Sequence, residues 1–313
     1  MMVGGDPERT GRGLATVSRR TAYAVVLGTY AVAGLVAALV VAVLAGRYHP
    51  LTVTLWADVA ATVVVFAAST VVANASLYDP YWSVAPSVVV VAWVLWAQSA
   101  DVGADPLRQV SVAVLVCAWA VRLTGNWARS WRGMRHEDWR YGHLRETRGA
   151  VPWWLVNVAG IQLMPTLVVF VGLLGCWPAV AVRGAPLGPL DAVAALVTAT
   201  AIAIEAAADG QLRRFAGDPV NRGAVIDRGL WRVSRHPNYL GEILFWWGLW
   251  LFGLAADPGW WWTVVGPLAM VLLFTTVSVP MMDRRSLLRR PGYAEHMRRV
   301  PGLFPRPGLP RRR

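Results

Sequence analysis

The residues best suited to chemistry lie in GLWRVSRHPNYLGEILFWWG, at positions 229–248. There, Arg232, Arg235 and His236 lead into Pro237, a residue common at the first position of a helix, and an apolar stretch follows. The amides at the start of such a helix, together with the arginines, would bind a phosphate or pyrophosphate at a membrane surface. The alternative is that the arginines only anchor a span to lipid headgroups.

Carboxylates inside apolar stretches also indicate a binding site. Asn238 and Glu242 are four residues apart and share a helix face, and Glu242 lies about one turn inside an apolar segment. An unpaired carboxylate there costs roughly 2 to 3 kcal/mol, so we expect an arginine or a bound ligand as its partner. Glu205 and Asp209 repeat the spacing at the end of an earlier apolar stretch. For this second pair, a structural salt-bridge network with nearby arginines is an equally good interpretation.

A third group of candidates lies in NASLYDPYWSVAP, at 74–86. Tyr78, Asp79 and Tyr81 form a compact acidic and aromatic set, and a tyrosine hydrogen-bonded to a carboxyl group can donate a proton to a carbonyl oxygen. The alternative, which composition alone favours, is an ordinary interfacial turn around Asp-Pro. Farther along, the arginine-rich and aromatic segment 122–146 would either line a charged cofactor or lie on lipid headgroups.

Other kinds of site find little support in the sequence. Cys117 and Cys176 each lie in an apolar stretch without a CxxC motif or a neighbouring histidine, so neither a disulfide nor a metal site is expected. His296 lies in the basic C-terminal segment, where a lone histidine is expected to be solvated. The net charge of +12 does not indicate a nucleic-acid partner, because the arginines cluster between apolar stretches instead of on a soluble basic surface.

Long apolar stretches must position all these residues. The chain of 313 residues is 56% apolar and only 15% charged, and its apolar residues fall in long blocks without an alternating or 3.6-residue pattern. We therefore predict an all-α, polytopic membrane bundle of about eight transmembrane helices, with seven to ten possible. The predicted spans are 22–46, 51–74, 83–100, 107–122, 151–182, 187–208, 239–256 and 259–282, and Pro165 is expected to kink the fifth.

The arginine distribution predicts the domain organisation and the orientation. We expect a cytoplasmic tail at 1–20, a single transmembrane domain at 21–300 and a flexible basic tail at 301–313. With the N-terminus in the cytoplasm, all arginines except Arg47, Arg108 and Arg183 lie on the inner side, as the positive-inside rule requires. The candidate site then faces the cytoplasm. Arginine without lysine, combined with many alanines and valines, suggests a GC-rich bacterial genome and hence a bacterial plasma membrane.

Five segments in order carry a resemblance to a known family. They are YDPYWS at 78–83, the pattern of Glu205, Asp209 and Gln211, the N.G…D.GLW pattern at 221–231, RHPNYLGE at 235–242 and RRPGYAEHMRRVPGLFP at 289–305. Together they resemble the DUF1295 group of the steroid 5-alpha-reductase family, and the similarity runs from about Asn74 to Pro307.

The resemblance implies a helical membrane oxidoreductase that binds NADPH at its cytosolic side and reduces an activated carbon-carbon double bond (an enone) of a steroid-like or other lipid from the bilayer. Carried over by motif, the cofactor-binding residues would be Glu205, Asp209, Asn221, Asp227, Arg232, Arg235, His236, Asn238, Tyr239, Glu242 and Asp283, together with the arginines that neighbour Asp283. The candidate proton donors are Tyr78, Asp79 and Tyr81. In the steroid enzymes a glutamate and a tyrosine on separate elements have this role, whereas this chain has an aspartate in a YDPYW context at the comparable place.

Two alternatives to a reductase remain open. RHPxYxG is shared with the isoprenylcysteine carboxyl methyltransferases, in which this region holds S-adenosylmethionine and a lipid or thiol is methylated. Glu242 directly after the motif glycine, and a single Asp283 where methyltransferases tend to show paired glutamates, favour the reductase. The other alternative is a non-enzymatic lipid-binding or transport protein, against which stand the lack of inverted repeats and the concentration of polar groups at one face.

Overall fold

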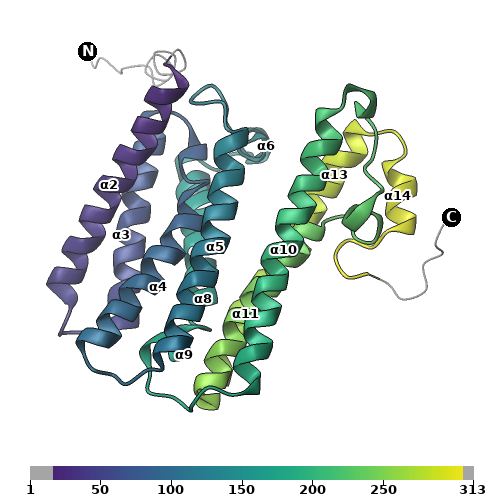
Figure 1. Ribbon diagram of the computed structural model, residues 1–313. Coiled ribbons are helices and arrows are strands. Elements are labelled where there is room, and N and C mark those ends of the chain that lie inside the picture. Colours follow the sequence, from purple (N-terminus) through teal and green to yellow (C-terminus); the bar gives the residue numbers. More distant parts are fainter. Residues whose placement is uncertain (1–16, 306–313) are drawn as a thin grey trace, which may run out of the picture. The chain divides into compact units, whose positions relative to one another are not determined.

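Helices make up the regular structure of the part of the chain that is described, residues 17–305, and no β-strand occurs there. Figure 1 shows the protein as a computed structural model. Eight helical segments of this part are long and apolar enough to cross a membrane. The predicted all-α class and the predicted number of spans are therefore confirmed, while the side on which the N-terminus lies stays a prediction.

Short 3₁₀- or π-helical segments, labelled η, subdivide three of the eight candidate spans. The spans are Arg19–Leu44 (α2), Pro50–Val71 (α3), Ala75–Ser99 (η1, Ala75–Leu77, and α4, Tyr81–Ser99), Pro106–Ser130 (α5), Trp153–Leu173 (α7, Trp153–Leu155; η2, Val156–Leu163; α8, Met164–Leu173), Pro189–Gly217 (α10), Pro237–Ala256 (α11) and Pro258–Arg289 (η5, Pro258–Val264; α12, Val265–Leu273; η6, Phe274–Ser278; α13, Val279–Arg289). The shorter helices are α6 (Trp139–Thr147), α9 (Trp177–Ala181), η3 (Pro219–Asn221), η4 (Gly229–Arg232) and α14 (Tyr293–Arg299).

The fifth and sixth spans differ most from their predicted bounds. The fifth ends at Leu173 instead of 182, and its π-helical segment η2 ends at Leu163, two residues before Pro165. Because proline cannot donate to the carbonyl four residues earlier, a widened turn at this place is physically reasonable. The sixth, α10, continues beyond 208 to Gly217 because good helix formers follow its apolar part, and it ends where Gly217 and Pro219 interrupt the helix.

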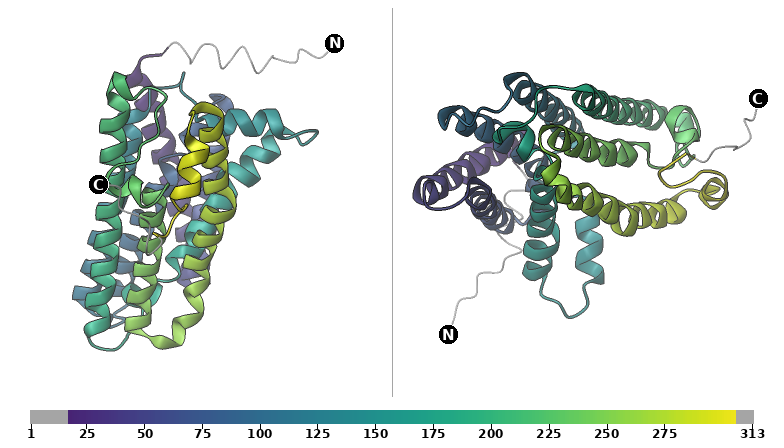
Figure 2. Two further views of the ribbon diagram at one scale, coloured as in Figure 1. Left: turned by 90° about the vertical axis from the view of Figure 1, so that its right-hand side faces the viewer. Right: turned by 90° about the horizontal axis from the view of Figure 1, so that it is seen from below.

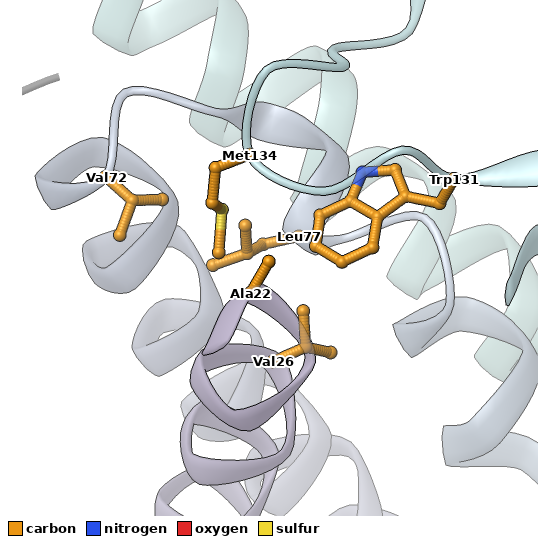
Figure 3. Packing of buried hydrophobic residues seen from close by; sticks show 6 residues of the cluster. All are labelled: Ala22, Val26, Val72, Leu77, Trp131 and Met134. Carbon is orange, nitrogen blue, oxygen red and sulfur yellow. The ribbon is translucent and has the colours of Figure 1, made fainter. Parts of the chain in front are cut away.

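Contacts between residues divide the chain into two compact units. The first consists of the chain up to Trp93 and of Trp119–Phe170, and the second of Val94–Ala118 and the chain from Val171 onwards. Within the first unit, α2 packs against α3. Figure 3 shows the apolar cluster at one end of this pair, which consists of Ala22, Val26, Val72, Leu77, Trp131 and Met134. This cluster holds η1, and with it the turn that carries the candidate proton donors.

Helices α10 and α11 form the closest pair of the second unit and run side by side in Figures 1 and 2. Two glycines of α11 make the close approach possible. A Cβ atom on Gly241 would lie 2.9 Å from the carbonyl oxygen of Ala201 and would overlap the side chain of Glu205, and one on Gly248 would lie 3.0 Å from the backbone nitrogen of Thr198. Small residues at helix contacts are typical of membrane bundles, since they let the backbones pack closely.

Substituting Gly241 with alanine is expected to lower the free energy of unfolding by about 1 to 3 kcal/mol, because α10 and α11 must move apart to admit the methyl group. Thermal unfolding of the detergent-solubilised protein measures the effect. Gly34→Ala is the control: Gly34 is exposed on α2 with no atom within 4 Å of the added Cβ, and this change should be neutral or slightly stabilising. Equal stability of both variants would contradict the prediction.

Candidate functional site

A cavity of about 240 Å³ lies in the second unit, where the loop after α10 and the start of α11 meet α13 and α14. Its charged and titratable lining consists of Arg235, Arg285, Arg289, Arg290, His236, Tyr239, Tyr293 and His296. The remaining lining residues are Leu212, Val225, Ile226, Trp231, Asn238, Met282 and Ser286. The lining contains four arginines and no Asp or Glu residue. The cavity is therefore suitable for an anion.

Asp283 holds one wall of the cavity together. Arg235 donates to its carboxylate from Nε at 3.2 Å and from Nη2 at 2.6 Å. The hydroxyl of Tyr293 donates to Oδ1 at 2.6 Å, and Nε2 of His236 lies 2.9 Å from the same oxygen. With only 6% of Asp283 exposed, one buried carboxylate connects α13, α14 and the residues that precede α11.

Burial and charge shift the pKa values around this network. Burial opposes the charge of Arg235, but its hydrogen bonds to Asp283 outweigh this effect and raise the pKa of Arg235. Burial, and then the hydrogen bond to Asp283, raise the pKa of Tyr293. Burial, and then the positive charges of Arg299 and Arg235, lower the pKa of His296. At neutral pH the wall therefore contains a charged guanidinium beside a neutral phenol and an uncharged His296 ring.

The segment after α14 is bound to the same motif. The backbone N–H groups of Arg235 and His236 donate to the carbonyl oxygens of Pro301 and Gly302, at 2.9 and 3.1 Å. The hydroxyl of Ser234 also donates to Gly302, at 3.2 Å. The start of the predicted flexible tail is thus fastened to the RHP motif, whereas its residues 306–313, like 1–16 of the predicted N-terminal tail, lie outside the described residues.

Gln211 and the GLW segment at 229–231 hold the loop after α10 against that helix. The Oε1 atom of Gln211 accepts a hydrogen bond from the backbone of Leu230 at 2.9 Å, and the indole of Trp231 donates to the carbonyl of Ala208 at 3.0 Å. Gly229 has φ +59°, and a Cβ atom there would lie 2.5 to 2.7 Å from the side chain of Gln211. Glycine is therefore required at 229 on both conformational and steric grounds.

Four of the predicted cofactor-binding residues line the cavity, namely Arg235, His236, Asn238 and Tyr239. Asp283 binds two of these directly. The other predicted residues do not line it: Asn221, Asp227 and Arg232 belong to the loop, where Asp227 and Arg232 are exposed.

The predicted carboxylates of the two spans are buried where α10 packs against α11. Glu205 is 2% exposed, Asp209 9% and Glu242 5%. The amide of Asn238 lies 3.5 Å from Oδ1 of Asp209, which links the two helices at their polar ends. Glu242 accepts a hydrogen bond at 2.9 Å from the indole of Trp246, one turn farther along α11. This indole is a partner that the sequence analysis did not foresee.

Several residues that line the cavity were not predicted individually from the sequence. Arginines that neighbour Asp283 were expected at the cofactor, but Arg285, Arg289 and Arg290 were not named individually, although 285 and 289 have the four-residue spacing of one helix face. The expectation that His296 is solvated was wrong, since the residue is 4% exposed. Its position on α14, whose Tyr293 bonds to Asp283, turns it into the cavity instead of towards solvent.

The candidate proton donors come together in the first unit. The rings of Tyr78 and Tyr81 lie 5.5 Å apart between centroids, and both residues are buried. The hydroxyl of Tyr81 donates to Oδ1 of Asp58 at 2.7 Å, and that of Tyr78 shares a hydrogen bond of 2.8 Å with Thr166. A tyrosine hydroxyl held by a carboxyl group on a separate helix is suited to proton donation.

Asp79, the third candidate donor, is bound differently. Its carboxylate accepts a short hydrogen bond from Tyr141 of α6. Burial, and then the charge of Asp79, raise the pKa of Tyr141. Tyr81 is therefore paired with Asp58, and Asp79 is paired with Tyr141 of α6.

Asp58 was missed altogether, yet the sequence carried the signal. It lies at the ninth position of α3 within LTVTLWADVAATVVV and is 7% exposed. A carboxylate inside an apolar span is costly and therefore marks a candidate functional residue. For metal binding, no group of three or more His, Cys, Asp or Glu residues that could hold an ion occurs between residues 17 and 305.

Comparison with known proteins supplies the family. The family model described as a protein of unknown function, DUF1295, matches residues 65–300, well over half of the chain. The chain belongs to the DUF1295 family. The DUF1295 match covers the tyrosines and the cavity but begins after Asp58.

A relative is known from a eukaryote. This DUF1295 protein is 26% identical over 257 residues to an uncharacterized protein of Schizosaccharomyces pombe, C594.04c, and the match covers 74% of this chain and 73% of the relative. No solved structure matches the chain.

Proposed function

We propose that this DUF1295 protein is a membrane oxidoreductase that uses NADPH to reduce the activated double bond of an enone lipid taken from the bilayer. The observation that carries the proposal is the cavity of the second unit with its four arginines. NADPH has a pyrophosphate and a ribose phosphate, and clustered guanidinium groups are the preferred partners of such groups. The arginine distribution supports a cytoplasmic position of this site.

The residues of the cavity fit the phosphate-bearing part of NADPH. Its volume of about 240 Å³ is smaller than the roughly 300 to 1,000 Å³ of whole ligand pockets, so it suits one end of a dinucleotide. Arg285, Arg289 and Arg290 would bind phosphate oxygens, while Arg235 stays paired with Asp283. Trp231 and Tyr239 offer aromatic faces to a base.

S-adenosylmethionine suits this lining less well. It has a sulfonium and an ammonium group and only one carboxylate, and the cavity has four guanidinium groups and no acidic lining residue. Cations brought beside this group of guanidinium groups are repelled by their positive charge. We therefore rank the methyltransferase and the non-enzymatic lipid-binding protein after the reductase, and the binding test below separates all three.

When bound, NADPH supplies the hydride for the β-carbon of a conjugated carbonyl. The protein then has to give a proton to the carbonyl oxygen. We assign this step to Tyr81, with Asp58 as the residue that positions its hydroxyl at 2.7 Å. General acid catalysis of this kind contributes typically about 10²- to 10⁴-fold to a rate.

Thermal unfolding of the detergent-purified protein with NADPH, NADH or S-adenosylmethionine tests the proposal. A ligand that binds only the folded state stabilises it by about 2.7 kcal/mol at 100 times its Kd. We expect a shift with NADPH that exceeds the shift with NADH, because NADH lacks the ribose phosphate. Arg289→Gln combined with Arg290→Gln should remove this difference, whereas Arg47→Gln, on the loop between α2 and α3, should not.

The other outcomes decide against the reductase. A shift with S-adenosylmethionine alone would support the methyltransferase. A shift with none of the three ligands would support the lipid-binding protein. If NADPH binds, its consumption with a sterol 4-en-3-one and with an α,β-unsaturated polyprenal, followed by ultraviolet absorbance, measures the activity.

A further inference from the structure

Hydroxyl groups of the first unit form a buried chain that crosses between helices. The hydroxyl of Tyr78 shares a hydrogen bond of 2.8 Å with Thr166 of α8, and Thr166 shares another of 2.8 Å with Thr62 of α3. All three residues are at most 2% exposed. Thr62 lies one helical turn from Asp58, the partner of Tyr81, and its side chain is close enough to the Tyr81 hydroxyl to interact with it. The chain of hydrogen bonds therefore runs from Tyr78 through Thr166 to Thr62 and ends beside Tyr81.

Threonines in membrane spans usually satisfy their hydroxyl groups within their own helix, by donating to the carbonyl four residues earlier. In this protein Thr198, Thr70 and Thr276 do so, at 2.7 to 2.9 Å. Thr62 and Thr166 bond across helices instead, although valine would fill the same space without a polar group. Their hydroxyl groups therefore form a continuous buried link between α3, α8 and the turn that carries Tyr78.

We propose that Thr166 and Thr62 are a proton relay that resupplies Tyr81 after each reduction, a role that rests on the proposed function. Tyr81 loses its proton to the carbonyl oxygen of the substrate. Thr62 then gives its proton to the oxygen of Tyr81, Thr166 gives one to Thr62, and Tyr78 gives one to Thr166. Water returns one proton to Tyr78 at the turn where its neighbour Asp79 is partly exposed, so each cycle takes up one proton and every hydroxyl is restored.

A serial hydroxyl chain predicts a specific kinetic signature. The first reduction uses the proton already on Tyr81, whereas later ones need the relay. In Thr166→Val the first turnover should therefore proceed at the wild-type rate, and later turnovers should be slower by about 10²-fold, the lower end of the usual contribution of proton transfer by a positioned side chain. Rapid mixing of the NADPH-loaded protein with the sterol 4-en-3-one or the polyprenal should show a burst of one product per protein.

Matched variants separate the relay from a structural effect. Thr166→Ser keeps the hydroxyl and should therefore show no burst. Thr62→Val interrupts the same chain and should show the burst that is expected for Thr166→Val. Thr70→Val loses a hydroxyl that bonds within its own helix and should behave as the wild type. The thermal shift with NADPH checks that each variant is folded.

Each result decides one of the two hypotheses. A burst in Thr166→Val that is absent in Thr166→Ser supports the relay. If Thr166→Val is slow from the first turnover, or shows the wild-type rate throughout, the relay is wrong and the reductase stands. If the wild-type protein binds NADPH but consumes it with neither enone, the proposed function is overturned and the relay with it.

Discussion

Replacing Tyr81 by phenylalanine is expected to reduce the turnover of an enone lipid by roughly 10²- to 10⁴-fold, the usual contribution of a general acid, while the binding of NADPH stays unchanged. The substitution removes only the hydroxyl that bonds to Asp58 at 2.7 Å and retains the ring, which packs against Tyr30 and Tyr78. The arginine-lined cavity contains neither Tyr81 nor Asp58. The rate constant and the cofactor affinity should therefore respond separately.

Tyr30→Phe is the matched control for this prediction. This substitution also removes one hydroxyl, which in Tyr30 donates to the carbonyl of Leu77 at 2.7 Å. The centroid of the Tyr30 ring lies 5.8 Å from that of Tyr81. We expect its turnover to fall by less than about 10-fold, because a single neutral hydrogen bond contributes about 1 kcal/mol. Asp58→Asn should resemble Tyr81→Phe more than Tyr30→Phe. An unaltered rate in Tyr81→Phe would remove this residue as the proton donor.

Much of the fold could be predicted because the membrane restricts the possibilities. Apolar blocks of sufficient length give helices, since every backbone group must be bonded within its own segment there. The ends were harder to predict, because a helix does not stop where its apolar part stops. In α10 the polar residues Gln211, Arg213 and Arg214 are good helix formers and continue the helix into the polar region.

The site could be predicted only in part, for a different reason. The motif residues Arg235, His236 and Tyr239 were found because they are close together in the sequence. Asp58 and Tyr81 are 23 positions apart and meet only through the packing of α3 and α4. Hydrophobic patterns give the face of a helix but not the helix that it packs against, so a pair of this kind is visible only as an isolated carboxylate in a span.

The largest loss of stability is expected for Asp283→Ala. This substitution leaves the mostly buried guanidinium of Arg235, together with His236 and Tyr293, without the carboxylate that accepts from them. Removing one partner of a buried ion pair costs about 3 to 5 kcal/mol, because the other charge stays buried without compensation. The thermal unfolding midpoint of the variant should fall. Because the wall of the cavity is disturbed, NADPH should no longer raise this midpoint more than NADH does. Glu295→Ala is the control, since its pairs with Arg298 and Arg299 are exposed and surface pairs contribute about 0 to 1 kcal/mol.

A double variant shows whether the loss comes from the uncompensated charge or from packing. When Arg235→Met is combined with Asp283→Leu, no buried charge of the pair remains, so this protein should be more stable than Asp283→Ala alone. Its NADPH shift should stay small, since His236 and Tyr293 still lack their acceptor and the RHP motif is no longer tied to α13. If the double variant is less stable than Asp283→Ala, packing accounts for the loss. In that case Asp283 holds the wall by its shape, and the charge that it places beside the arginines of the cavity is incidental.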